Sequence, residues 1–202
     1  MIDITAIILA AGLSRRMGQQ NKLLLPVNGV PMVRLMVGVY SAVTTRPVLV
    51  VTGHEAKEIE AALDGTCAEF VFNPDYAEGQ ATSVACGLRA AAHGIPLLVG
   101  LGDQPLLTAD DLRALLAAHE GADPTRISIP VRDQQRGNPI VIPEALRTAL
   151  LADRRSPGCK KFTRAHPEHV QFHKLAAAGF YTDVDTLQAY DAVLAHPVEE
   201  AL

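Results

Sequence analysis

Residues 4–26 read ITAIILAAGLSRRMGQQNKLLLP and join a short apolar run to a glycine-containing, cationic loop. Apolar runs such as 4–10 are typical of strands that are buried on both faces of a parallel sheet. The loop behind the run carries Arg15, Arg16 and Lys22, and no acidic residue interrupts the stretch. Because ligands of open α/β sheets bind beyond the carboxyl ends of the strands, this loop is a candidate anion site.

Apolar runs and segments of helical spacing alternate along the rest of the chain, which predicts an α/β fold with a mostly parallel sheet. After residue 131 the pattern changes to isolated strands, and we expect an antiparallel member among them. Thr108, followed by Asp111, resembles a helix N-cap with an acid at the third helical position. The predicted strands are 4–10, 47–53, 68–73, 95–103, 126–131, 138–143 and 169–175, and the predicted helices are 31–43, 55–63, 81–92, 109–119 and 187–196.

The composition is that of one globular domain with a sizeable core, with 202 residues, 49% of them hydrophobic. The formal net charge of −4 argues against general nucleic-acid binding, which needs a cationic surface. Three scattered cysteines without a CxxC pair favour neither a zinc site nor a disulfide framework, and they indicate a reducing compartment. No apolar run approaches the about 20 residues that span a bilayer, and the N-terminus lacks a cationic leader. We therefore expect a cytoplasmic protein that binds no membrane.

The loop after the first strand is not one of the common phosphate-binding motifs. Five residues separate Gly12 from Gly18, whereas a P-loop has four and then Lys-Ser/Thr, and the GxGxxG fingerprint is absent. The residue types nevertheless suit phosphate, since glycines allow positive φ and Ser14 can add a hydroxyl to the basic side chains. The alternative is a glycine turn with solvated basic residues.

The stretch LAAGLSRRMGQQNKLLLPVNGVPMV (9–33) resembles the LAAGxSxRMG…K…GxPM signature of nucleotidyltransferases that load a nucleotide onto a phosphorylated small molecule. In detail it is similar to molybdenum cofactor cytidylyltransferases and their molybdopterin guanylyltransferase relatives. The resemblance continues in order through NPDYAEGQATSVACGLRAA, LGDQPLLTADDL, RGNPIVIP and DVDTLQAYDAV. It implies a three-layer Rossmann-like nucleotidyltransferase fold in a single domain over 1–202, with a nucleotide-binding part at 1–105 and an acceptor-binding part at 106–202.

The resemblance also implies an activity, which is Mg²⁺-dependent transfer of CMP from CTP to the phosphate of molybdopterin with release of pyrophosphate. Arg16, Lys22 and Asp103 would be catalytic, and Asp103 and Asp185 would hold the Mg²⁺, with Asp183 as a weaker candidate. We expect Arg16 on the β- and γ-phosphates and Lys22 near the α-phosphate. The implied nucleotide-binding residues are Leu9, Ala10, Ala11, Gly12, Ser14, Arg16, Gly18, Lys22, Gly79 and Ser83, and the implied acceptor-binding residues are Arg136, Gly137 and Asn138.

The choice of base and acceptor stays open on the sequence. LAAG resembles the cytidylyl branch and LAGG is usual in the guanylyl branch, so the methyl group of Ala11 would narrow the space for a purine. One methyl group is worth only about 1–3 kcal/mol of discrimination, so a GTP-dependent enzyme is the first rival hypothesis. The residues also allow a different phosphorylated acceptor, an oxidoreductase on a similar sheet, or a non-catalytic partner of a molybdoenzyme or its chaperone.

The segment RRSPGCKKFTRAHPEH (154–169) corresponds to a variable glycine-containing loop and helix of that family. Its basic residues Arg154, Arg155, Lys160 and Lys161 could attract an anionic pterin phosphate, although such a run is more often a solvated face. The family often has an acid and a glycine where this chain has Ser-Pro-Gly-Cys. This departure leaves the identity of the acceptor open.

Overall fold

Strand β1 (Thr5–Leu9) lies in the middle of the main sheet, between β4 (Val48–Thr52) and β6 (Leu97–Leu101), and pairs with both in parallel. The structure is a computed structural model, and it describes residues 3–18, 20–152 and 159–195. Ile7 and Ile8 are both fully buried and point to opposite faces, because side chains alternate along a strand. Each therefore joins a different core cluster, one on each side of the sheet.

The main sheet has eight strands in the order β10-β7-β9-β6-β1-β4-β5, with β8 paired to β7. Strand β9 runs antiparallel to both β6 and β7, and β8 is antiparallel to β7, whereas the remaining pairs are parallel. The mostly parallel sheet with an antiparallel member is thus confirmed. The other strands are β5 (Ala68–Phe72), β7 (Ile127–Arg132), β8 (Gln135–Arg136), β9 (Ile140–Ile142) and β10 (Val170–Lys174).

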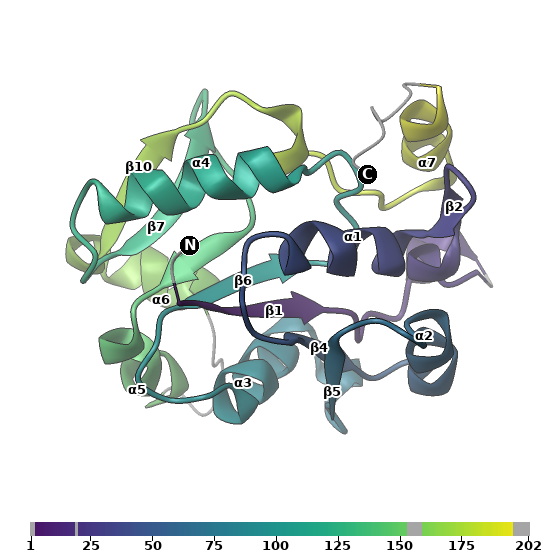
Figure 1. Ribbon diagram of the computed structural model, residues 1–202, viewed down its shortest axis with the longest axis horizontal. Coiled ribbons are helices and arrows are strands. Elements are labelled where there is room, and N and C mark those ends of the chain that lie inside the picture. The colour runs from purple at the N-terminus through teal and green to yellow at the C-terminus, as the bar shows by residue number, and fades with distance from the viewer. Residues whose placement is uncertain (1–2, 19, 153–158, 196–202) are drawn as a thin grey trace.

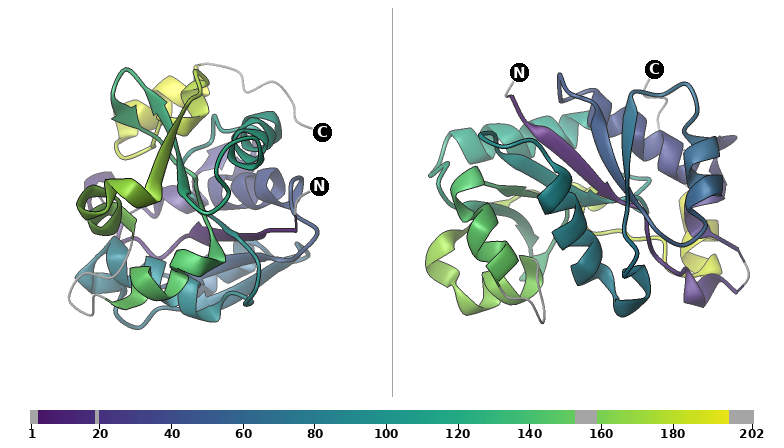
Figure 2. Two further views of the ribbon diagram at one scale, coloured as in Figure 1. Left: turned by 90° about the vertical axis from the view of Figure 1, so that its left-hand side faces the viewer. Right: turned by 90° about the horizontal axis from the view of Figure 1, so that it is seen from below.

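Helices cover both faces of the sheet and complete a three-layer arrangement (Figure 1). Helices α1 and α4 pack on one face, where the core includes Met36 and Leu115, and α3 and α5 pack on the other, where it includes Leu88 and Leu150. Figure 2 shows α3, α5 and α6 lying together over that second face. The helices are α1 (Met32–Ser41), α2 (Ala56–Ala62), α3 (Gln80–Ala90), α4 (Ala109–Glu120), α5 (Glu144–Ala152), α6 (Cys159–Ala165) and α7 (Leu187–Leu194).

The predicted strands and helices are confirmed to within a few residues at their ends. The cap at Thr108 is a full capping box, in which Thr108 and Asp111 each accept a hydrogen bond from the other's backbone N–H. Helix α5 and the two-stranded β2–β3 hairpin (Pro26–Val27 and Val30–Pro31) were not predicted from the sequence. Helix α5 had a helical signal in the buried pair Leu146 and Leu150, four positions apart, behind Pro143. In the described part of the chain, no helix is long and apolar enough to cross a bilayer.

Candidate active site

Three segments meet at the carboxyl edge of the sheet. The loop after β1 and the loop after β6 are joined where Gly102 N–H donates to the carbonyl of Leu9 at 3.2 Å. The segment before α7 is tied to the second of these loops, because Val184 N–H donates to the carbonyl of Asp103 at 2.9 Å. A cleft of about 1580 Å³ opens at this point.

The cleft gathers almost all the residues that the sequence singled out. It is lined by Leu9, Ala11, Gly12, Ser14, Arg16, Lys22, Gly79, Ser83, Asp103, Asp183, Asp185, Arg136, Gly137 and Asn138. Two predicted residues do not line it. Ala10 is 1% exposed and belongs to the core, because it faces away from the cleft at the end of β1. Gly18 ends the short 3-10 turn Arg15–Met17.

The backbone of the cationic loop departs in one respect from the expectation that its glycines supply the positive φ angles. Ser14 is in the left-handed region at φ 47°, Gly18 has φ 69°, and Gly12 is not among the residues with positive φ. A Cβ atom on Gly12 would meet no atom within 4 Å, so this glycine leaves open space in the cleft. The Oγ of Ser14 accepts a hydrogen bond from the backbone N–H of Lys22 at 3.3 Å, which ties the two ends of the loop together.

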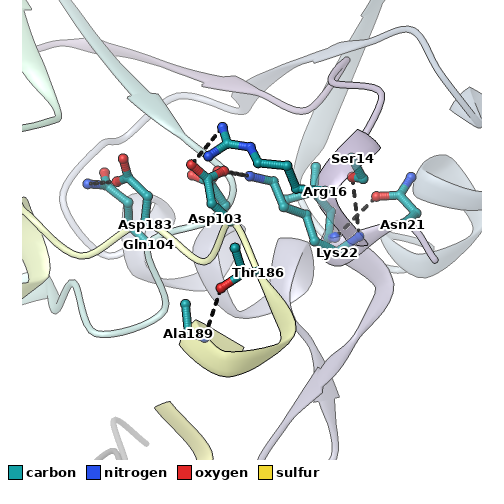
Figure 3. A network of polar contacts seen from close by, with 11 residues as sticks. Ser14, Arg16, Asn21, Lys22, Asp103, Gln104, Asp183, Thr186 and Ala189 are labelled. Atoms are coloured by element: carbon teal, nitrogen blue, oxygen red, sulfur yellow. Dashed lines mark hydrogen bonds and ion pairs between the residues drawn. The ribbon is translucent and has the colours of Figure 1, made fainter. Parts of the chain in front are cut away.

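Lys22 lies at the centre of a polar network (Figure 3). It begins a 3-10 turn that Asn21 caps through a hydrogen bond from Leu23 N–H at 3.1 Å. Its ammonium donates to Oδ2 of Asp103 and, at 2.8 Å, to Oδ1 of Asp185. The guanidinium of Arg16 reaches the other oxygen of Asp185 at 3.0 Å. The loop after β1 is therefore cross-linked by charge to the loops before α4 and α7.

The surroundings shift the pKa values of these groups in opposite directions. Burial by itself would lower the pKa of Lys22, but the Asp103 and Asp185 carboxylates outweigh it and hold that pKa above its usual value. The hydrogen bond from Lys22, with help from Arg16, lowers the pKa of Asp185. Burial, together with the charges of Asp103 and Asp185, raises the pKa of Asp183 to about 6. A hydrogen bond from Gln104 Nε2 at 2.9 Å holds Asp183 in place.

The carboxylates offer ligands that suit a magnesium ion. The Oδ1 atom of Asp103 is buried and has no hydrogen-bond partner among the described residues, although buried carboxylate oxygens normally have one. No group of three or more His, Cys, Asp or Glu side chains in 3–18, 20–152 and 159–195 is arranged to hold a metal by itself. Mg²⁺ usually takes one or two carboxylates and completes its shell with water and substrate phosphates. The residues present therefore fit Mg²⁺ as a partner of the substrate rather than as a permanently caged ion.

The far side of the cleft, at the start of α3, carries a second polar group of contacts. Ser83 is 4% exposed, and its Oγ accepts a hydrogen bond from Asn73 Nδ2 at 3.0 Å. Asn73 also donates to Thr82 Oγ1 at 2.9 Å. No role for Asn73 was predicted from the sequence, although this residue opens the NPDYAEG segment directly after β5. Its contacts leave the Ser83 hydroxyl hydrogen available for a group in the cleft.

The residues predicted for the acceptor lie at the opposite end of the cleft from Ser83's helix, on β8 and the segment after it. Gly137 N–H donates to the carbonyl of Pro130, and Asn138 N–H donates to the carbonyl of Phe180, both at 2.9 Å. Arg136 donates to Thr163 Oγ1 at 3.3 Å and so contacts α6. Lys160 and Lys161 also line the cleft, whereas Arg154 and Arg155 lie outside the described residues.

Comparisons with known proteins identify the family of the chain and proteins of similar fold. A family model described as the MobA-like NTP transferase domain matches residues 6–170. Nicotine blue oxidoreductase of Paenarthrobacter nicotinovorans is 30% identical over 193 residues, which span 92% of this chain and 93% of that protein. A solved nucleotidyl transferase from Methanothermobacter has a TM-score of 0.81 and 27% identity, and the match covers 96% of this chain and 97% of that one. The manganese complex of Rv0371C from Mycobacterium tuberculosis has a TM-score of 0.70 with coverage of 96% and 99%, and at 22% identity its likeness is one of fold.

Proposed function

This chain belongs to the MobA-like NTP transferase domain family and is a nucleotidyltransferase, and from this premise we propose that it transfers CMP from CTP to the phosphate of molybdopterin. Pyrophosphate is released, and Mg²⁺ is the cofactor. The nucleotide would bind mainly to the 1–105 part and the acceptor mainly to the 106–202 part of one domain. A reducing, cytoplasmic setting and delivery of the product to a molybdoenzyme or its chaperone belong to the same proposal.

The observation that carries the proposal is the contact of Lys22 with both Asp103 and Asp185 inside the cleft. It brings a cation, a guanidinium from Arg16 and two carboxylates to one point behind β1. Phosphoryl transfer needs such a set of charges, because it is catalysed mainly by positioning and by electrostatic stabilisation.

The reaction itself makes little demand for a general base. The acceptor is a phosphate monoester with a second pKa of about 6, so it is largely ionised at neutral pH. Its oxygen forms a bond to the α-phosphorus of CTP, and the bond from that phosphorus to the bridging oxygen breaks. Pyrophosphate then leaves with the electron pair. What the protein must supply is positive charge where two anions meet.

Lys22 and Arg16 divide that task in our proposal. An ammonium has three N–H donors, and two of those on Lys22 are directed at Asp103 and Asp185, which leaves one for a phosphate oxygen. The side chain of Arg16 is 70% exposed, so it can turn from Oδ2 of Asp185 toward the β- and γ-phosphates and leave that oxygen for the metal ion. Mg²⁺ held by Asp103 and Asp185 would neutralise charge between the acceptor and the α-phosphate. The manganese complex of the M. tuberculosis structural neighbour supports the use of a divalent ion.

CTP is favoured over GTP by the surroundings of Ala11. Its side chain is 3% exposed and lines the cleft, and a Cβ atom on Gly53 would approach its methyl group to 2.8 Å. The methyl group is therefore packed against a neighbouring backbone and does not move aside easily. A GTP-dependent transfer to molybdopterin and a transfer to another small phosphorylated acceptor are the rival hypotheses within this chemistry.

The test is pyrophosphate release by the full chain with Mg²⁺, with each of the four nucleoside triphosphates, and with and without purified molybdopterin. We expect release with CTP that depends on molybdopterin. A preference for GTP would make the protein a guanylyltransferase. If none of the four nucleotides gives pyrophosphate release in response to molybdopterin, the proposal that molybdopterin is the acceptor is overturned. The same assay without protein is the blank.

A second candidate follows from the name of one relative, since a protein 30% identical over most of both chains is called an oxidoreductase. An oxidoreductase would need a redox cofactor or a redox-active substrate, and the GxGxxG fingerprint is absent from this sequence. Absorbance spectra of the purified protein between 300 and 500 nm would detect a flavin or a reduced nicotinamide, by ordinary cofactor spectroscopy. We expect no such band, and a stoichiometric band would favour the oxidoreductase.

A further inference from the structure

A second, smaller pocket lies beside the cleft, at the carboxyl ends of β7 and β10. Its volume is about 730 Å³, within the range of about 300–1,000 Å³ that is usual for small-molecule sites. We call it the basic pocket, because Arg132, Arg136 and Lys174 line it. The other polar or aromatic residues of its lining are Phe172, Gln134 and one acid, Asp133. Its three cations and one acid contrast with the net charge of −4 of the whole chain. The pocket therefore favours an anion.

An aromatic ring lies exposed among these charges. Phe172 stands on the edge strand β10 with 48% of its surface exposed, and the guanidinium carbon of Arg136 lies 4.9 Å from the centre of its ring. Arg132 packs in the same way over Tyr181 at 4.5 Å and is held by a hydrogen bond to the carbonyl of Ala176 at 3.2 Å. A phenyl ring with one guanidinium packed on it, in a pocket that two further cations line, is suited to a planar, anionic or electron-rich ring, which can stack on either kind of group.

The basic pocket adjoins the cleft of the candidate active site. Gln134 and Arg136 line both spaces. Gln134 and its neighbour Asp133 form the two-residue turn between β7 and β8, and their φ angles of 68° and 47° are those of a tight hairpin turn. Gln134 and Arg136 thus lie at the boundary where the cleft and the basic pocket meet, and Phe172 lies directly behind Arg136.

The opposite edge of the sheet provides a contrast. Phe72 on β5 is 53% exposed, but its ring packs edge-on against Tyr76 at 6.5 Å. Within 3–18, 20–152 and 159–195, both guanidinium-over-ring contacts lie at the basic pocket. An exposed phenylalanine alone needs no explanation, whereas one that is flanked by cations and opens onto a reaction cleft indicates a ligand.

We infer that the basic pocket is the subsite for the ring end of the acceptor, which is a heterocycle with negatively charged substituents whose phosphate lies in the cleft. The inference rests on the proposed transfer to a phosphorylated acceptor and assigns the part of the acceptor that does not react. In it Phe172 stacks on the ring, while Lys174 and Arg132 meet negative charge at its edge. These residues bind the acceptor and make no contribution to binding of the nucleotide.

The experiment measures acceptor and nucleotide binding separately in the full chain. The variants are Phe172→Leu and Lys174→Gln, and the matched controls are Phe72→Leu on the other edge strand and Lys57→Gln on α2. Steady-state pyrophosphate release at saturating CTP and Mg²⁺ gives the KM for molybdopterin, and calorimetric titration with CTP gives the nucleotide Kd. We expect each pocket variant to raise the KM for molybdopterin about tenfold and to leave the CTP Kd within about twofold of the native value. The controls should change neither quantity.

The outcomes separate the inference from the proposed function. If native protein transfers CMP to molybdopterin and both pocket variants keep the native KM, the inference is overturned and the proposed function stands. If native protein releases no pyrophosphate in response to molybdopterin, the proposed function is overturned, and the inference with it. A loss of CTP binding at an unchanged melting temperature would overturn the inference, and a loss with a lowered melting temperature would show that the variant is misfolded. Lys174→Gln, an exchange at an exposed position, then decides the matter alone.

Discussion

The ammonium of Lys22 donates a hydrogen bond to Oδ1 of Asp185 at 2.8 Å, which joins two residues that are 163 positions apart in the chain. The same ammonium contacts Asp103, and the side chains of Lys22 and Asp103 are 14% and 13% exposed. Ion pairs that are shielded from water interact more strongly than surface pairs and are costly to break by removing one partner. The cationic loop is thus drawn to the carboxylates before any substrate is present.

Replacing Asp103 by asparagine should abolish most of the activity and preserve the fold. The change keeps the shape of the side chain and removes one charge from the carboxylate pair that is proposed to hold Mg²⁺. We expect turnover to fall on the order of 1,000-fold while the melting temperature changes by a few degrees. Asp64→Asn, at an exposed position, is the matched control and should be neutral. Unchanged turnover of Asp103→Asn with Mg²⁺ would remove this mechanism.

Lys22→Ala should lower the rate constant more than the affinity for nucleotide. The third N–H donor of this ammonium is proposed to contact the reacting phosphate, where negative charge increases in the transition state, so its loss should reduce kcat about 100-fold. The KM for CTP should change by less than about tenfold. The measurement is steady-state kinetics with CTP varied, with Lys57→Ala as the control. The reverse pattern would make Lys22 a ground-state binding residue.

Removal of the Lys22 charge should also tighten binding of a divalent ion in the absence of nucleotide. The ammonium now neutralises Asp103 and Asp185, and it repels a second cation at the same carboxylates. Lys22→Met keeps the length of the side chain without the charge. Titration with Mn²⁺, followed by the electron paramagnetic resonance of the free ion, should give a lower Kd for the variant than for native protein. An equal or higher Kd would place the ion elsewhere.

Asp183 should make the unliganded protein less stable as the pH rises through 6. Its pKa is raised to about 6 in the folded state, above the 3.8 of an ordinary aspartate, so the folded state binds more protons between these values. The native state is therefore favoured at pH 4 relative to pH 7, as far as this group is concerned. The Asp183→Asn variant should lack this effect. Its free energy of unfolding, relative to that of native protein, should therefore increase from pH 4.5 to pH 7. Urea unfolding with EDTA present measures the difference, and a constant difference would contradict the assignment.

Two histidines that contact one buried serine should act on stability with the opposite sign. Ser128 Oγ, which is fully buried, contacts His119 Nδ1 at 2.8 Å and His173 Nε2 at 2.9 Å. Burial lowers the pKa of both histidines, and the neighbouring His173 lowers that of His119 further. In the unfolded chain a histidine has its ordinary pKa of about 6.5, so below that pH the unfolded chain binds more protons than the folded protein. The contribution of these histidines to the free energy of unfolding is therefore present above that pH and is lost as the pH falls. His173→Gln should lose less stability than native protein between pH 7.5 and 5.5, as urea unfolding at the two pH values measures, and an equal loss would contradict the assignment.

Much of the fold could be predicted because its signals are local. The run at 4–10 has two buried faces, and Thr108 and Asp111 are close enough in sequence to form their cap whatever the rest of the chain does. Helix α5 was not predicted, although Leu146 and Leu150 are four positions apart, as on one face of a helix. The β2–β3 hairpin was missed because strands of two residues have no periodicity to detect.

The site was predictable as a set of residues but not as a set of contacts. The order of motifs along the chain pointed to Arg16, Lys22, Asp103 and Asp185, and all four line one cleft. The role of Asn73 in orienting Ser83 was not visible, since a lone asparagine after a strand is common in turns. The basic pocket was not visible either, because Arg136 and Phe172 become neighbours only when β8 and β10 flank β7.

The sequence by itself determined the alternation of buried strands and helices, the capping of α4 and the positive charge behind β1. These depend on residue types and on spacings of a few positions. Only the tertiary structure decided that Lys22 bridges Asp103 and Asp185, that the left-handed turn falls on Ser14, and that the basic pocket lies beside the cleft. The physical reason is that these features arise where the carboxyl ends of β1, β6 and β7 converge, and the packing of the sheet alone sets the distances between them.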